Sequence, residues 1–168
     1  MIGSGDISPI KDNGTSHFPG FVGIDLHGKE KIIPDSFSGN LNVIVVGFLR
    51  EHQDPINTWI PEVEALMAET PGLAFYEVPL IYKINPAYRT WINNGMRMGI
   101  PDDAARSRTI TVYTDREKFL QVTNMQPDRI YVLLLDKAGK ILWRAEGPVT
   151  AKNLNSLKKT ISIHKKGN

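Results

Sequence analysis

The chain has 168 residues, of which 41% are hydrophobic and 23% are charged. These proportions fit one ordinary globular domain with a single buried core, and they argue against two domains. The formal net charge of +2 is too small to indicate a nucleic-acid partner. Because the chain contains no cysteine, disulfide exchange and every other reaction of a protein thiolate are excluded.

The two ends of the chain differ in composition from its middle. Residues 1–16 are rich in Gly, Ser, Asp and Asn and lack the apolar core of a secretion signal, so we expect a flexible segment. The longest apolar run, 41–49, is too short to cross a bilayer, and no transmembrane segment is predicted. We therefore expect one domain over 17–163, followed by a basic tail over 164–168.

The first half of the domain predicts a hairpin, a central strand and a helix. Residues 21–33 alternate apolar and polar side chains around a Gly that predicts a turn. Residues 43–48 are rich in β-branched residues without alternation, which is typical of a strand covered on both faces. Asp54 and Pro55 predict a helix start, with the Asp side chain as the cap. Its apolar face would hold Ile56, Trp59, Ile60, Val63, Leu66 and Met67.

The second half predicts further alternation of strands and helices. We expect a strand over 73–80 parallel to the central strand, and a helix around 88–96. A short strand over 109–113 and a short helix over 116–122 follow. A second hairpin then joins 130–136 to 141–145, and Thr150 caps a last helix whose apolar face holds Leu154, Leu157 and Ile161.

The segment between the central strand and the first helix has the form of a thioredoxin active-site loop without its cysteines. Phe48 ends an apolar strand, and Pro61 stands where thioredoxin-like proteins have a kinking proline. Gln53 and Ile56 then occupy the two vestigial cysteine positions. Together with the order of elements, this motif predicts an α/β thioredoxin-like three-layer fold. A central mixed sheet would be flanked by helices, with an N-terminal hairpin and a middle insertion.

Polar side chains gather at the carboxyl end of the central strand, where ligands of parallel α/β sheets bind. The candidate binding residues there are Arg50, Glu51, His52, Gln53 and Asp54, with Trp59 one turn into the helix. Arg50 and the helix N-terminus would attract an anionic group, and His52 or Glu51 could carry protons. Alternatively the loop is a solvated remnant whose Asp54 only caps the helix, and Trp59 and Trp143 are core residues.

One further candidate lies before the second hairpin. In thioredoxin-like proteins a cis-proline faces the cysteine pair from this place, and counting back from Asp136 puts Ile130 there. Pro127 could substitute only in a different register. The missing proline argues independently against a redox role.

Other kinds of site are poorly supported. The four histidines, His17, His27, His52 and His164, lack the close spacing of zinc ligands, so no metal and no cofactor is predicted. A group of arginines in the middle insertion could form a basic face for an acidic partner, although such a group is more often a solvated surface. Its members are Arg89, Arg97, Arg106, Arg108 and Arg116.

Several short motifs together resemble the thioredoxin-like assembly chaperones of the mitochondrial ATP synthase membrane sector and their bacterial relatives. They are Phe18-Pro19 with Asp25-Leu26 and Gly28-Lys29, Phe48 and Arg50 followed by Trp59, Phe75-Tyr76-Glu77-Val78 with Leu80, and Tyr131-Val132 through Trp143. The resemblance covers roughly residues 18–160. It implies a redox-inactive protein that binds a partner subunit while a membrane complex assembles, in a mitochondrial or a bacterial periplasmic or membrane-associated setting.

Three hypotheses remain open from the sequence. The first is the redox-inactive binding or assembly protein. The second is an enzyme without thiols, which would need Arg50, His52 and Glu77 to converge on one pocket. The third is a purely structural module, which a flat, well-packed surface around Gln53 and Ile130 without an exposed apolar patch nearby would favour.

Overall fold

A computed structural model describes residues 17–82, 108–114 and 116–166. Its elements are β1 (Phe21–Asp25), β2 (Glu30–Ile33), β3 (Leu41–Gly47), the 3-10 turn η1 (Arg50–His52), α1 (Gln53–Glu69), β4 (Leu73–Tyr82), β5 (Ile110–Thr114), α4 (Arg116–Thr123), β6 (Tyr131–Asp136), β7 (Ile141–Glu146) and α5 (Ala151–Lys166). The helix predicted around 88–96 lies outside the described residues. So do Arg89, Arg97 and Arg106 of the predicted basic face.

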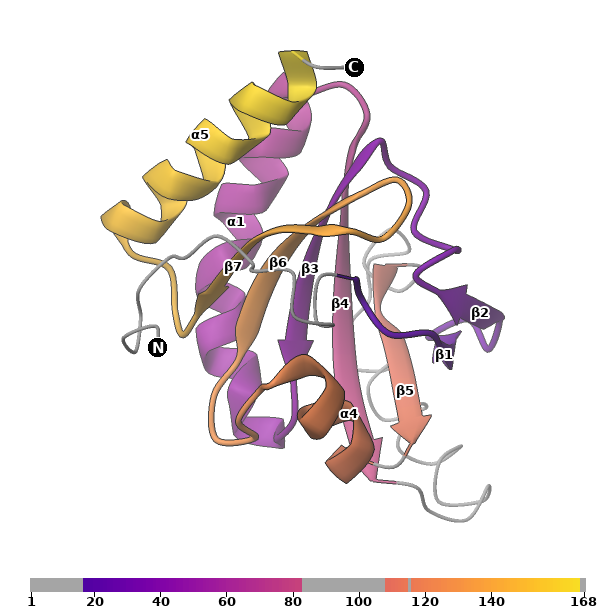
Figure 1. The fold of residues 1–168 in the computed structure, drawn as a ribbon. Coiled ribbons are helices and arrows are strands. Elements are labelled where there is room, and N and C mark those ends of the chain that lie inside the picture. The colour runs from indigo at the N-terminus through magenta and orange to yellow at the C-terminus, as the bar shows by residue number, and fades with distance from the viewer. Residues whose placement is uncertain (1–16, 83–107, 115, 167–168) are drawn as a thin grey trace.

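One mixed sheet of seven strands runs through the molecule in the order β2-β1-β5-β4-β3-β6-β7 (Figure 1). β3 pairs with β4 in parallel and with β6 antiparallel, and all seven of its residues are buried. Unbroken β-branched sequence suits a strand that has apolar neighbours on both faces. The predicted central strand and its parallel partner are therefore confirmed.

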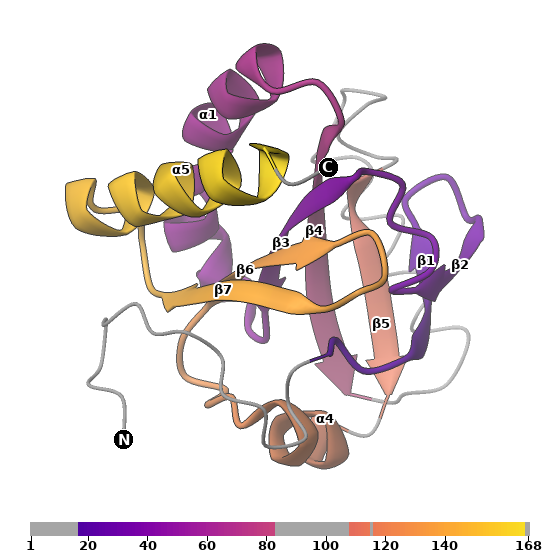
Figure 2. The ribbon, with the colours of Figure 1, turned by 45° about the horizontal axis from the view of Figure 1, so that its top comes forward.

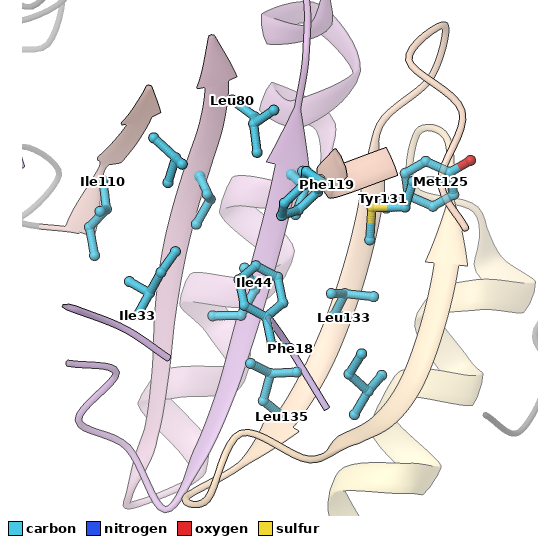
Figure 3. Close-up of a cluster of buried hydrophobic side chains, with 14 of the residues drawn as sticks. Phe18, Ile33, Ile44, Leu80, Ile110, Phe119, Met125, Tyr131, Leu133 and Leu135 are labelled. Atoms are coloured by element: carbon cyan, nitrogen blue, oxygen red, sulfur yellow. The ribbon is translucent and has the colours of Figure 1, made fainter. Parts of the chain in front are cut away.

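Helices cover both faces of the sheet. α1 and α5 lie on one face and α4 on the other (Figures 1 and 2). On the α4 side, Phe18, Ile44 and Phe119 belong to a buried cluster that also takes in Tyr131 and Leu133 (Figure 3). The predicted three-layer thioredoxin-like arrangement is thus confirmed. No helix in the described ranges combines the length and the apolar character needed to span a bilayer.

The core on the α1 side is anchored by two tryptophans. Trp59 is fully buried, and its ring meets Trp143 edge to face with ring centres 6.3 Å apart. The Trp59 Nε1–H donates to the Gly147 carbonyl at 2.9 Å, and the Trp143 Nε1–H donates to Ser156 Oγ at 3.0 Å. A buried indole N–H needs an acceptor, and both tryptophans have one. The two hydrogen bonds and the ring contact join α1, the end of β7 and α5.

Both predicted hairpins are present, and the cap of the last helix is where the sequence predicted it. β1 pairs with β2 and β6 pairs with β7, both antiparallel. The Asn153 backbone N–H donates to Thr150 Oγ1 at 3.1 Å, and the Thr150 N–H donates to Asn153 Oδ1 at 2.7 Å. This reciprocal pair satisfies two N–H groups at the start of α5. α5 continues to Lys166, so it includes the first residues of the predicted basic tail.

The burial of Trp59 leads to a first prediction. Replacing Trp59 by Ala should lower the free energy of unfolding by about 3 to 5 kcal/mol, because it removes a large buried side chain and leaves a cavity. Val122→Ala is the control, since Val122 on α4 is 38% exposed and should change stability by less than about 0.5 kcal/mol. Urea denaturation measures both, and equal effects of the two substitutions would contradict the packing described here.

Candidate functional site

The polar turn predicted as the candidate site lies at the carboxyl end of β3, where η1 leads directly into α1. Arg50, Glu51, Gln53 and Asp54 are all exposed there. Leu49 precedes them with 47% of its surface exposed, whereas His52 is only 6% exposed. The structure therefore brings together a short exposed segment, 49–54, around one buried histidine.

His52 holds this turn in place through its ring. The backbone N–H of Phe48 donates to His52 Nδ1 at 2.9 Å, and the N–H of Leu49 approaches the same atom at 3.2 Å. An Nδ1 that accepts these bonds carries no proton, so the neutral ring has its proton on Nε2. Within the described part of the chain, His52 Nε2 has no hydrogen-bond partner although it is buried.

The first helix does not start where we predicted. α1 begins at Gln53, and the backbone of His52 is already helical at φ −67° and ψ −13°. The predicted role of Asp54 as the cap is therefore wrong. Because the Gln53 backbone N–H donates to the carbonyls of η1, the chain enters the helix directly from that turn, without a side-chain cap from Asp54. Asp54 instead lies in the first turn of α1, where the positive end of the helix dipole favours its negative charge.

Burial controls the charge of His52. Loss of water around the ring lowers the pKa of His52 below its usual 6.5, and the Asp128 backbone and the carboxylates of Glu51 and Asp128 only partly oppose this effect. Protonation would also replace the Nδ1 acceptor by a donor facing two backbone N–H groups. The neutral ring is thus the form that fits the turn.

The two residues predicted at vestigial cysteine positions have different surroundings. Gln53 is exposed, and its amide donates to Asn57 Oδ1 at 2.8 Å along the first turn of α1. Ile56 is 6% exposed and belongs to the core on the α1 side. A side chain at Gly47 would come within 3.1 Å of Ile56 Cδ1, so the isoleucine fills the space above the end of β3. One position faces solvent, and the other is part of the core.

Two of the predicted binding residues lie in the core. Trp59 is fully buried, and Ile130 is 1% exposed in the same cluster as Ile56. The Ile130 carbonyl accepts from the Gly147 N–H at 3.1 Å, just before β6 begins. A cis X-Pro bond occurs elsewhere, at Ile33–Pro34. Trp59 and Ile130 are therefore core residues, and neither side chain is available to a partner at the surface.

A buried carboxylate lies on β4 and interacts with the start of α1. Glu77 is 6% exposed, and burial raises its pKa above the usual value, while Arg108 and a side-chain hydrogen bond from Gln53 partly offset that rise. Arg108 itself forms an ion pair with Glu64 at 3.0 Å and stacks over the Phe75 ring. Arg108, one of the arginines of the predicted basic face, thus contacts groups of its own chain.

The three residues of the enzyme hypothesis are in different surroundings. The groups that act on His52 are Asp128 and Glu51, whereas those that act on Glu77 are Arg108, Gln53 and Glu64. Arg50 is exposed to solvent. A hollow of about 410 Å³ lies instead at the opposite end of β3, lined by Asn40, Leu41, Asp136, Lys137, Ala138, Leu142 and His164. No group of three metal-ligating side chains occurs within the described residues.

Two features of the site escaped the sequence reasoning. The apolar run 41–49 includes Leu49, but β3 ends at Gly47 and the Leu49 side chain is exposed. Asp128 acts on His52 from a loop far along the chain. Its carboxylate forms a two-bond ion pair with Arg129, at 2.8 and 3.1 Å. No local sequence signal marks the exposure of Leu49 or the effect of Asp128 on His52, because both depend on how distant segments pack.

Comparison with known protein families gives one match over most of the chain. Residues 4–163 match the family described as ATP10 protein. No curated protein matches the sequence.

Solved structures with the same fold are numerous and distant in sequence. A thiol:disulfide interchange protein DsbE from Chlorobium tepidum, titled as putative, superposes with a TM-score of 0.58 at 13% identity, over 91% of this chain and 98% of that chain. The thioredoxin domain of a thiol-disulfide oxidoreductase from Bacteroides vulgatus gives 0.57 at 18% identity, over 89% and 98%. BsSco, a member of the Sco family of cytochrome c oxidase assembly proteins, gives 0.58 at 13% identity, over 91% and 98%. At these identities the likeness shows the thioredoxin-like fold alone.

The lowered pKa of His52 predicts an acid-sensitive fold. Below the usual value of 6.5 the unfolded chain takes up a proton that the folded chain resists, so the free energy of unfolding should fall as the pH drops through this range. His52→Asn offers an amide oxygen to the same N–H groups without titrating, and should weaken this pH dependence. Urea denaturation at neutral and mildly acidic pH measures it, with exposed His27→Asn as the control; an unchanged dependence in His52→Asn would overturn the assignment.

The raised pKa of Glu77 predicts that its charge lowers the free energy of unfolding at neutral pH. Its charged form is disfavoured in the folded protein, so Glu77→Gln should raise the free energy of unfolding at neutral pH. The gain should vanish as the pH falls towards the usual value of 4.5, where the unfolded carboxyl also becomes protonated. Thermal unfolding across this pH range measures the effect, and exposed Glu51→Gln is the matched control. A destabilised Glu77→Gln at neutral pH would show that the charge is required.

Proposed function

The chain belongs to the ATP10 protein family, and from this premise we propose that it is a redox-inactive assembly factor that binds a protein subunit of ATP synthase as the complex forms. The observation that carries the proposal is the family match over residues 4–163 of a chain without cysteine. A thioredoxin-like fold without thiols retains a binding location and loses the redox chemistry.

The exposed turn 49–54 supports a binding role. Leu49 presents an apolar side chain beside the charged Arg50 and Glu51, and this mixture is what a protein surface can recognise. The turn is held from below by His52, which accepts two backbone hydrogen bonds. A turn that is already ordered loses little conformational entropy when a partner binds. We therefore assign the partner contact to Leu49, Arg50, Glu51, Gln53 and Asp54.

We also infer that the protein is not an enzyme. The runner-up, catalysis by Arg50, His52 and Glu77, is disfavoured because the Arg50 side chain is exposed and the hollow of about 410 Å³ lies at the other end of β3. A purely structural module remains the alternative, because one exposed leucine does not make an apolar patch.

Affinity capture from detergent-solubilised native membranes tests the proposal. The wild-type chain should enrich ATP synthase subunits, and the double variant Leu49→Ser with Arg50→Ser should lose most of them. Because both side chains are exposed, the variant should keep the stability of the wild type to within about 0.5 kcal/mol. Circular dichroism and thermal unfolding check this before capture.

A matched control separates the turn from the rest of the surface. Val22→Ser with Lys29→Ser removes one exposed apolar and one cationic side chain from the β1–β2 hairpin, and should leave capture intact. Equal losses in both double variants would place the contact elsewhere. If the folded wild-type protein enriched no ATP synthase subunit, the proposed function would be wrong.

A further inference from the structure

The charges of the last helix are all of one sign. α5 contains five lysines in sixteen residues and no Asp or Glu. Lys152, Lys158, Lys159 and Lys165 are exposed, and the first and last of these lie about 20 Å apart at 1.5 Å per residue. A helix of ordinary composition would carry carboxylates among its lysines, since such pairs stabilise a solvated helix. The exposed sides of α5 thus carry positive charge from one end of the helix to the other.

An apolar side chain lies within this surface. Ile163 is 59% exposed, although Leu157 and Ile161 on the inner face of the same helix are buried. Ile163 follows Lys159 by one helical turn, so both lie on the same side of α5. The outer face therefore combines mobile positive charges with one protruding aliphatic group.

Three lysines of α5 differ from the arginines of the fold. In the described part of the chain, no ion pair involves Lys158, Lys159 or Lys165. Arg129 by contrast pairs with Asp128 and Glu146, and Arg144 donates to the Thr123 carbonyl at 2.7 Å.

The neighbouring helix carries the opposite charge. α1 contains Asp54, Glu62, Glu64 and Glu69 and no basic residue. α1 and α5 lie side by side on the same face of the sheet (Figures 1 and 2). A negative surface that approached this side of the molecule would attract α5 and repel α1. The charge distribution consequently selects one orientation, with α5 towards the negative surface.

We propose that the outer face of α5 docks the protein on an anionic phospholipid bilayer, with its exposed lysines near the headgroups and Ile163 inserted beside Lys159. Each lysine near an anionic membrane surface strengthens binding by roughly fivefold, so the exposed lysines of α5 together supply a reversible attachment. The exposed isoleucine adds burial of apolar surface at the headgroup level. This site is separate from the turn 49–54 and does not depend on the function proposed for it.

The composition of the face favours lipid over an acidic protein as the partner. Protein interfaces are enriched in arginine, whose planar group binds carboxylates with two hydrogen bonds, and are depleted in lysine. A lysine is a flexible point charge that suits a diffuse layer of phosphates. All five α5 cations other than histidine are lysine, so the charge of the helix suits a diffuse anionic layer.

Co-sedimentation with lipid vesicles tests the proposal with the purified full chain. The protein should bind vesicles of roughly two parts phosphatidylcholine to one part phosphatidylglycerol, and should not bind pure phosphatidylcholine. Binding should disappear at about 1 M salt, where the screening length falls to about 3 Å. Equal binding to both vesicle types, or binding to neither, would overturn the proposal. Binding to polyglutamate without binding to vesicles would also overturn it, because the partner would then be an acidic protein.

Paired variants locate the attachment on α5. Lys158→Gln with Lys159→Gln should weaken binding to the anionic vesicles by roughly tenfold or more. Lys29→Gln with Lys118→Gln removes the same charge from the β1–β2 turn and α4, and should change the affinity by less than about threefold. If both pairs weakened binding equally, the attraction would come from net charge and the assignment to α5 would be wrong.

A fluorescent probe reports insertion independently of affinity. Because the native chain has no cysteine, Ile163→Cys can be labelled at a single position with an environment-sensitive dye. Its emission should shift to the blue on anionic vesicles, while the same dye at Val122→Cys on α4, across the sheet, should not shift. A shift at Val122→Cys without one at Ile163→Cys would place a different face on the bilayer.

Discussion

The rest of the structure depends on the complete burial of β3. A strand with no exposed residue must have apolar cover on both faces and a partner on each edge. α1 with α5 supplies one cover, the α4 side supplies the other, and β4 and β6 supply the edges. At the carboxyl end of this strand the chain reaches the surface, where Leu49 is exposed and η1 begins. The exposed turn is therefore fixed at its base by the most buried element of the fold.

This geometry explains how a thioredoxin-like fold can serve a protein that has no thiol. Ile56 lies in the core, whereas Gln53 lies at the surface and bonds to Asn57. His52 holds the turn with hydrogen bonds that need no charge. The recognition proposed at the turn and the membrane attraction proposed for α5 involve separate surfaces. Together the two proposals describe a protein that meets its partner at a membrane.

Sequence patterns predicted what depends on local forces. The central strand followed from a run of β-branched residues, and the α5 cap followed from Thr150. The start of α1 differs from the prediction because the carbonyls of η1, not the carboxylate of Asp54, accept the first backbone N–H of the helix. The exposure of Leu49 and the link between Glu77 and Gln53 also escaped prediction. Those features depend on distant segments meeting, which no spacing along the chain encodes.

The central claim is that a partner subunit contacts the exposed turn directly, and site-specific crosslinking tests it most directly. Gln53→Cys, carrying a photoreactive maleimide as the only thiol adduct on the chain, would be irradiated in native membranes. The account predicts a covalent product with a membrane-sector subunit of ATP synthase, and none from the same label at Val22→Cys on β1. Crosslinking from position 22 but not from position 53 would contradict it, because the partner would then bind a different face of the fold.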